Sequence, residues 1–137
     1  MRTIALRLPP GSDVRAGLDQ VVREQGLPAA VVVGAVGSLS RAMLRHAGRE
    51  TGTLLTGDLE LLTLSGTLGP EGCHLHAAVA DATGAVHGGH VLAGCVVRTT
   101  LELVLGIPEG VTFLRRHDPD TGYRELLIRP LNPAETP

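Results

Sequence analysis

The chain has 137 residues and a hydrophobic fraction of 43%, which is enough for one core in a single domain, with one Phe, one Tyr and no Trp. The formal net charge is −2 and no basic run exceeds the pair Arg115–Arg116, so the basic surface of an autonomous DNA-binding protein is missing. We expect a cytoplasmic protein, because the sequence has no signal-peptide pattern, no apolar run long enough to span a membrane, and too few cysteines for a disulfide framework.

The first two elements are predicted by their hydrophobic periodicity. Apolar residues alternate over residues 4–8, which is typical of a half-buried strand. Ser12 or Asp13 can cap a helix that runs to about Gln25, with its apolar residues on one face. Gly26 is well placed to end this helix.

The middle of the chain is predicted to consist mainly of strands. Residues 29–36 are continuously apolar, which is typical of a strand covered on both faces. Residues 38–56 have no clear pattern; within them, residues 41–46 could form a strand or a helical turn, and both stay open. Alternation predicts strands over 59–68 and 74–80, and a turn over 81–84 follows the second of them. In the first of these strands, Leu64 is predicted to share a face with Glu60, opposite Leu61.

The C-terminal part also favours β-structure. Residues 91–105 are mostly β-branched or Leu, which predicts one or two strands. Residues 118–122, Asp-Pro-Asp-Thr-Gly, form a turn signal between strands predicted at 111–116 and 123–128. We expect residues 130–137, with three prolines, to be a frayed tail. With one helix among many strands, the prediction is an α+β domain with a mixed, largely antiparallel sheet.

A histidine cluster is the main candidate for chemistry. Four of the six histidines, His74, His76, His87 and His90, lie within seventeen residues. Positions i and i+2 of a strand share a face, so His74 and His76 project together, and the turn at 81–84 can fold His90 back towards them. Neutral imidazole is a good ligand for transition metals. His74, His76 and His90 therefore predict a metal site; the alternative is that these histidines bind no metal. His87 is a weaker candidate for a ligand of this site.

The remaining reactive residues have simpler interpretations. Cys73 faces away from the histidines on the predicted strand, and Cys95 lies in an apolar run typical of a core. Asp81 fits a turn residue that bonds its own backbone, whereas Glu60 would need a partner such as Arg98 if buried. Either carboxylate could also support a histidine from outside the ligand set.

Several motifs together resemble one known family. Residues 57–68 read GDLELLTLSGTL and residues 74–77 read HLHA, followed by Asp81, Gly84 and the segment GGHVLAG at 88–94. This combination resembles the plant-and-prokaryote conserved (PPC) domain, which follows AT-hook motifs in plant nuclear proteins and stands alone in prokaryotes.

The resemblance covers about residues 4–128 and implies several further properties. It implies a mixed β-sheet with flanking helices and assembly as a homotrimer, which agrees with the gain that a core of small aliphatic side chains would make from burial between subunits. It also implies a metal, zinc before other divalent transition metals, held by His74, His76 and His90.

Three functional hypotheses follow. The first is a trimeric metal-binding domain with a binding or regulatory role and no established catalysis. The second is a metal-dependent enzyme acting on a small molecule, with water at an open metal position and Glu60 or Asp81 as the acid/base group. The third is DNA binding, which only the family supports; plant members bind through AT-hooks, and this chain lacks the Arg-Gly-Arg-Pro core.

Overall fold

The computed structural model describes residues 1–132 and consists mostly of β-strands, whose pairings are all antiparallel. Strand residues make up 62% of the structure and helical residues 8%. The predicted α+β class with a mixed sheet and flanking helices was therefore wrong, and the fold is closer to all-β. The described elements are β1 (Arg2–Leu8), α1 (Val14–Glu24), β2 (Ala30–Arg45), β3 (Thr53–Gly69), β4 (Gly72–Ala80), β5 (Val86–Val91), β6 (Val96–Ile107), β7 (Val111–His117) and β8 (Arg124–Pro130).

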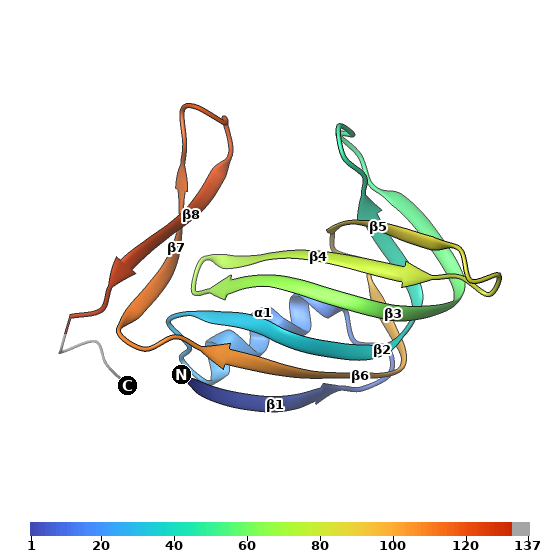
Figure 1. Cartoon of the computed structure of the whole chain (residues 1–137), viewed down its shortest axis with the longest axis horizontal. Coiled ribbons are helices and arrows are strands. Elements are labelled where there is room, and N and C mark those ends of the chain that lie inside the picture. The colour runs from blue at the N-terminus through green and yellow to red at the C-terminus, as the bar shows by residue number, and fades with distance from the viewer. Residues whose placement is uncertain (133–137) are drawn as a thin grey trace.

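The main sheet has six strands in the order β1-β6-β2-β3-β4-β5 (Figure 1). Strand β5 also pairs with the end of β2, through Leu44 with Val91 and Arg45 with His90. The segment β2 to β5 thereby curls back on itself. Register shifts in β2, such as the one between Leu39 and Arg41, bend the strand in the way this closure requires. The result brings the end of β2 beside the β4–β5 hairpin.

Strands β2 and β3 are much longer than the sequence pattern indicated. The region 38–56 forms the end of β2, the turn and the start of β3 in one long β-hairpin, so residues 41–45, left open between a strand and a helical turn, belong to a strand. The prediction that 29–36 is covered on both faces was wrong, because Val33 and Val36 are 58% and 60% exposed. One face of this part of the sheet is open.

The predicted helix is confirmed and covers the other face. Asp13 is its N-cap and accepts a hydrogen bond from the Ala16 amide at 3.0 Å. Val14, Leu18 and Val22 recur at a spacing of four residues and are buried in the core. Figure 1 shows α1 lying against the sheet. No helix of the described residues is long and apolar enough to cross a membrane.

A β-bulge decides which side chains of β3 enter the core. The register with β4 shifts between Leu61 and Thr63. The predicted alternation placed Leu64 on the same face as Glu60, but Leu64 is buried with Leu59 and Leu61 while Glu60 is exposed. The extra residue reverses the alternation, so the predicted face assignment was wrong from the bulge onwards.

Strands β7 and β8 form the predicted hairpin, which projects beside the end of the main sheet (Figure 1). Its anchor is Pro28, whose carbonyl accepts hydrogen bonds from the Phe113 amide at 2.9 Å and the Thr112 hydroxyl at 3.0 Å. Pro130, the first residue of the predicted frayed tail, is instead the last residue of β8. Residues 133–137 of that tail lie outside the described part of the chain.

Candidate metal centre

Strand β4 presents two histidines on one face and apolar residues on the other. Cys73, Leu75 and Ala77 point into the core, whereas His74 and His76 are exposed. This alternation follows directly from the period of two along a strand. The prediction that His74 and His76 project together is confirmed.

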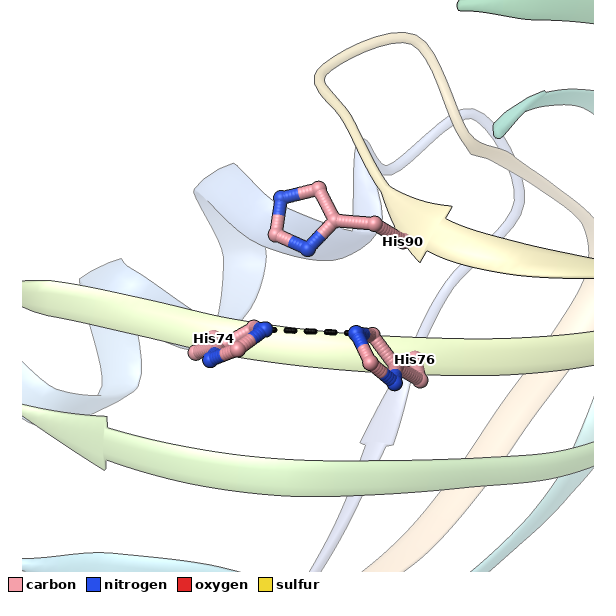
Figure 2. Close-up of side chains that lie close together, drawn as sticks. All are labelled: His74, His76 and His90. Carbon is pink, nitrogen blue, oxygen red and sulfur yellow. Dashed lines mark hydrogen bonds between the residues drawn. The ribbon is translucent and has the colours of Figure 1, made fainter. Parts of the chain in front are cut away.

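The third histidine comes from β5. His90 is the cross-strand partner of His76, and the three imidazole rings converge (Figure 2). Ring centroids are 5.0 Å apart for His74 and His76, 5.1 Å for His74 and His90, and 5.7 Å for His76 and His90. One nitrogen of each ring can be chosen so that all three lie within 4.8 Å of one another.

The distances and donor types fit a small divalent cation. Zn–N bonds of about 2.0–2.1 Å place two ligand nitrogens of a tetrahedral site about 3.3 Å apart. The Nε2 atoms of His74 and His76 lie 3.2 Å apart. His90 Nδ1 is buried and has no hydrogen-bond partner among the described residues. A nitrogen lone pair left unsatisfied beside two other imidazoles is what a metal would satisfy.

The surroundings of His74 and His90 favour the neutral form of these two rings. Burial, followed by the charges of His74 and Arg45, lowers the pKa of His90 from 6.5 to about 4. The pKa of His74 is also lowered, mainly by burial and then by His76. Metal binding requires unprotonated imidazole, so protons compete weakly with a metal at these two residues.

Of the adjacent Gly88 and Gly89, only Gly89 is needed for close packing between strands. A Cβ atom at residue 89 would lie 2.7 Å from the carbonyl oxygen of Arg45, whereas at residue 88 its nearest contact would be 3.4 Å from the carbonyl oxygen of Ala77. Only a glycine at 89 therefore allows β2 to approach β5. This approach sets the position of His90 relative to β2.

His87 lies outside the cluster and is bound to the turn. Its Nε2 is 3.0 Å from Asp81 Oδ2. The other carboxylate oxygen of Asp81 accepts hydrogen bonds from the Thr83 amide, the Thr83 hydroxyl and the Ala85 amide. The Thr83 hydroxyl and then His87 hold the pKa of Asp81 well below its usual range. The interpretation of Asp81 as a turn residue is confirmed, and its histidine partner is not one of the three.

The other residues singled out by sequence are distant from the cluster or inert. Glu60 is exposed and pairs across the sheet with Ala80 of β4. Ala80 lies four residues beyond His76, a distance of about 13 Å along the strand. Arg98 lies 3.1 Å from Asp58 rather than pairing with Glu60. Cys95 is buried as predicted.

A cleft beside the cluster contains residues that the sequence did not indicate. It has a volume of about 390 Å³. Its lining is Arg15, Arg45, Glu71, Gly72, Cys73, His74, His90, Arg115, Tyr123, Arg124 and Glu125. These residues come from α1, from three strands of the main sheet (β2, β4 and β5) and the β3–β4 turn, and from the β7–β8 hairpin. No local pattern connects them, because only the topology brings them together.

Comparison with known proteins identifies the family. The model of the Plants and Prokaryotes Conserved (PCC) domain matches residues 1–107. The chain belongs to this family. It is the PPC family that the histidine and glycine motifs resemble, and β7 and β8 lie beyond the matched residues.

Solved structures share the PPC fold over nearly the whole chain. A hypothetical protein from Salmonella cholerae-suis is 47% identical, with a TM-score of 0.91 and 94% of each chain covered. A metal-containing protein from Archaeoglobus fulgidus is 27% identical, with a TM-score of 0.81, covering 93% of this chain and 94% of that one. Both alignments cover more of the chain than the family model does.

A curated relative is much longer than this PPC chain. The bifunctional protein GlmU of Synechococcus sp. (strain JA-3-3Ab) is 47% identical over 137 residues, which is 100% of this chain and 22% of that protein. The chain therefore spans about a fifth of the length of this relative.

Proposed function

We propose that this PPC domain binds a divalent transition metal, zinc in the first place, through His74, His76 and His90. The observation that carries the proposal is the convergence of three imidazoles, two from β4 and one from β5, with nitrogens within 4.8 Å of one another. The buried, unpartnered Nδ1 of His90 supports it. So does the neutral state that burial favours at His74 and His90. Among the fold neighbours, the Archaeoglobus protein is described as metal-containing.

The proposal includes assembly as a homotrimer. Its support is an open apolar groove across β1, β2 and β6, whose exposed residues include Val33, Val36 and Val104. Exposed apolar area of this kind commonly marks a subunit contact. The number of subunits is what the family resemblance implies.

The role proposed for the domain is binding or regulation rather than catalysis. The two carboxylates considered as acid/base groups, Glu60 and Asp81, lie at the other end of β4 from the histidines. Glu71 in the cleft is bound to Arg116 at 2.7 Å, and its hydrogen bonds lower its pKa, so it is a weak base. In the longer relative from Synechococcus, a matching segment makes up 22% of the protein, which suits an accessory module.

Elemental analysis tests the metal site. Protein purified without a metal-affinity tag, then loaded with zinc and desalted, should retain about one zinc per chain. H76A should lose it, whereas H117A, which removes an exposed histidine at the end of β7, should retain it. Zinc absent from the parent protein after loading, or equal in H76A and H117A, would overturn the proposal.

A further inference from the structure

The cleft beside the histidines has more positive charge than its own acids neutralise. Four arginines line it, against the carboxylates of Glu71 and Glu125. Glu71 already binds Arg116 at 2.7 and 2.8 Å and lies 3.7 Å from Arg124. Of the four lining arginines, Arg124 therefore has a carboxylate nearby. The positive charges of the other three lining arginines remain to be balanced.

These three arginines, Arg15, Arg45 and Arg115, come from α1, β2 and β7 and are all half-buried. Among residues 1–132, no carboxylate lies within ion-pair distance of their guanidinium groups, although the backbone amide of Arg115 donates a hydrogen bond to Glu71. Like charges brought to one cleft repel each other, and partial burial weakens the screening by water. An anion in the cleft would remove this repulsion.

Two of the three guanidinium groups are held in place by neutral acceptors. Arg15 donates to the carbonyl oxygens of Val91 at 2.9 Å and Cys73 at 3.2 Å. Arg115 donates to the Thr67 hydroxyl at 2.8 Å. Neutral acceptors orient a guanidinium without cancelling its charge, so these groups are preorganised for an anion.

Arg45 is different, because its side chain has no hydrogen bond or ion pair within the described part of the chain. Its backbone pairs with that of His90, which fixes the point where the side chain leaves the sheet. A guanidinium fork with free donors matches the planar acceptor pair of a carboxylate or phosphate, and this one lines the same cleft as His74, His90 and the two oriented arginines.

We propose that Arg15, Arg45 and Arg115 form a binding site for a small organic or inorganic acid, carrying a carboxylate or phosphate group, beside His74 and His90. The volume of about 390 Å³ is at the lower end of the range for small-molecule sites and suits a metabolite-sized acid. This inference extends the proposed function, since it gives the metal domain a ligand class. The arginines themselves need no metal to attract an anion.

Calorimetric titration of EDTA-treated and zinc-loaded protein with inorganic phosphate and with succinate tests the site. The parent should bind at least one probe saturably, and which one it binds distinguishes a phosphate site from a carboxylate site. R45Q should weaken binding about tenfold or more, as expected for a charge-assisted hydrogen bond. R49Q, the matched control, removes an exposed arginine that does not line the cleft and should bind like the parent.

The outcomes separate this proposal from the metal site. Loss of binding in R45Q, with thermal unfolding equal to that of R49Q, supports the anion site. No saturable binding of either probe, or equal binding by R45Q and R49Q, overturns it. Zinc retention without anion binding would support the metal site and reject the anion site. Anion binding by a protein that holds no zinc would support the anion site and reject the metal site.

Discussion

His76 on β4 lies directly across from His90 on β5, and their ring centroids are 5.7 Å apart. The third ring, His74, therefore meets a pair whose separation is set by backbone hydrogen bonds of the hairpin rather than by loop conformation. Sites built on strands hold their ligands more precisely than sites built on loops.

Zinc should stabilise the folded protein through these three residues. A ligand that binds only the native state adds about 2.7 kcal/mol when its free concentration is 100 times its Kd. Thermal unfolding of the parent should shift upwards with zinc, and H74A or H90A should abolish most of the shift. H117A should shift like the parent. An unchanged shift in H90A would mean that zinc binds elsewhere.

The metal-free protein should lose stability as the pH falls from 6.5 towards 4. Burial lowers the pKa of His90 to about 4 from 6.5, so in this interval the unfolded chain binds a proton that the native state does not. Acid therefore favours unfolding, and the free energy of unfolding decreases as the pH is lowered through this interval. H90Q, which has no titrating group, should show a flatter pH dependence of its unfolding midpoint. Parallel curves for parent and H90Q would contradict this assignment.

Two adjacent glycines should respond very differently to the same substitution. G89A places a Cβ 2.7 Å from the carbonyl oxygen of Arg45, so β2 and β5 must separate, at about 1–3 kcal/mol in chemical denaturation. G88A meets its nearest atom at 3.4 Å, an ordinary contact, and should change stability by less than about 1 kcal/mol. Because β5 supplies His90, G89A should also weaken zinc binding. Equal effects from the two substitutions would rule out this packing role.

Asp81 should matter for stability and not for metal content. Its carboxylate accepts hydrogen bonds from the Thr83 amide at 2.9 Å, the Thr83 hydroxyl at 2.6 Å and His87 at 3.0 Å. D81A should lower the midpoint of chemical denaturation, because several donors lose their acceptor. Zinc retained after loading should equal that of the parent. A folded D81A protein without zinc would show that the turn supports the metal site directly.

The histidine pair was predictable because it rests on the shortest-range rule in the structure. Alternation along a strand gives His74 and His76 one face, and the turn at 81–84 returns the chain within hairpin distance, which brings in His90. The capped helix at Val14–Glu24 was predictable for the same reason, since its cap and periodicity are local.

What the sequence could not indicate depends on contacts between distant segments. The bulge between Leu61 and Thr63 reverses the faces of β3. The adjacent Leu61 and Leu62 interrupt the alternation there, but the pattern alone does not show which leucines then enter the core. Arg15 and Arg45 are thirty residues apart and share a cleft only because β5 returns to β2. The exposure of Val36 could not be predicted either, because a run of apolar residues does not show whether both faces of a strand are covered.

The open apolar face of β2 is the proposed contact between subunits. Val36 and Val86 are each 60% exposed, but only Val36 lines the apolar groove across β1, β2 and β6. If copies of the chain meet on this groove, V36R inserts a charge that the contact must desolvate, and the assembly should dissociate into smaller species. V86R makes the same change on β5, outside the groove, and should not affect assembly. Sedimentation velocity gives the size of each species. A trimer in both variants would exclude this face as the contact, and a monomeric parent would exclude the proposed assembly.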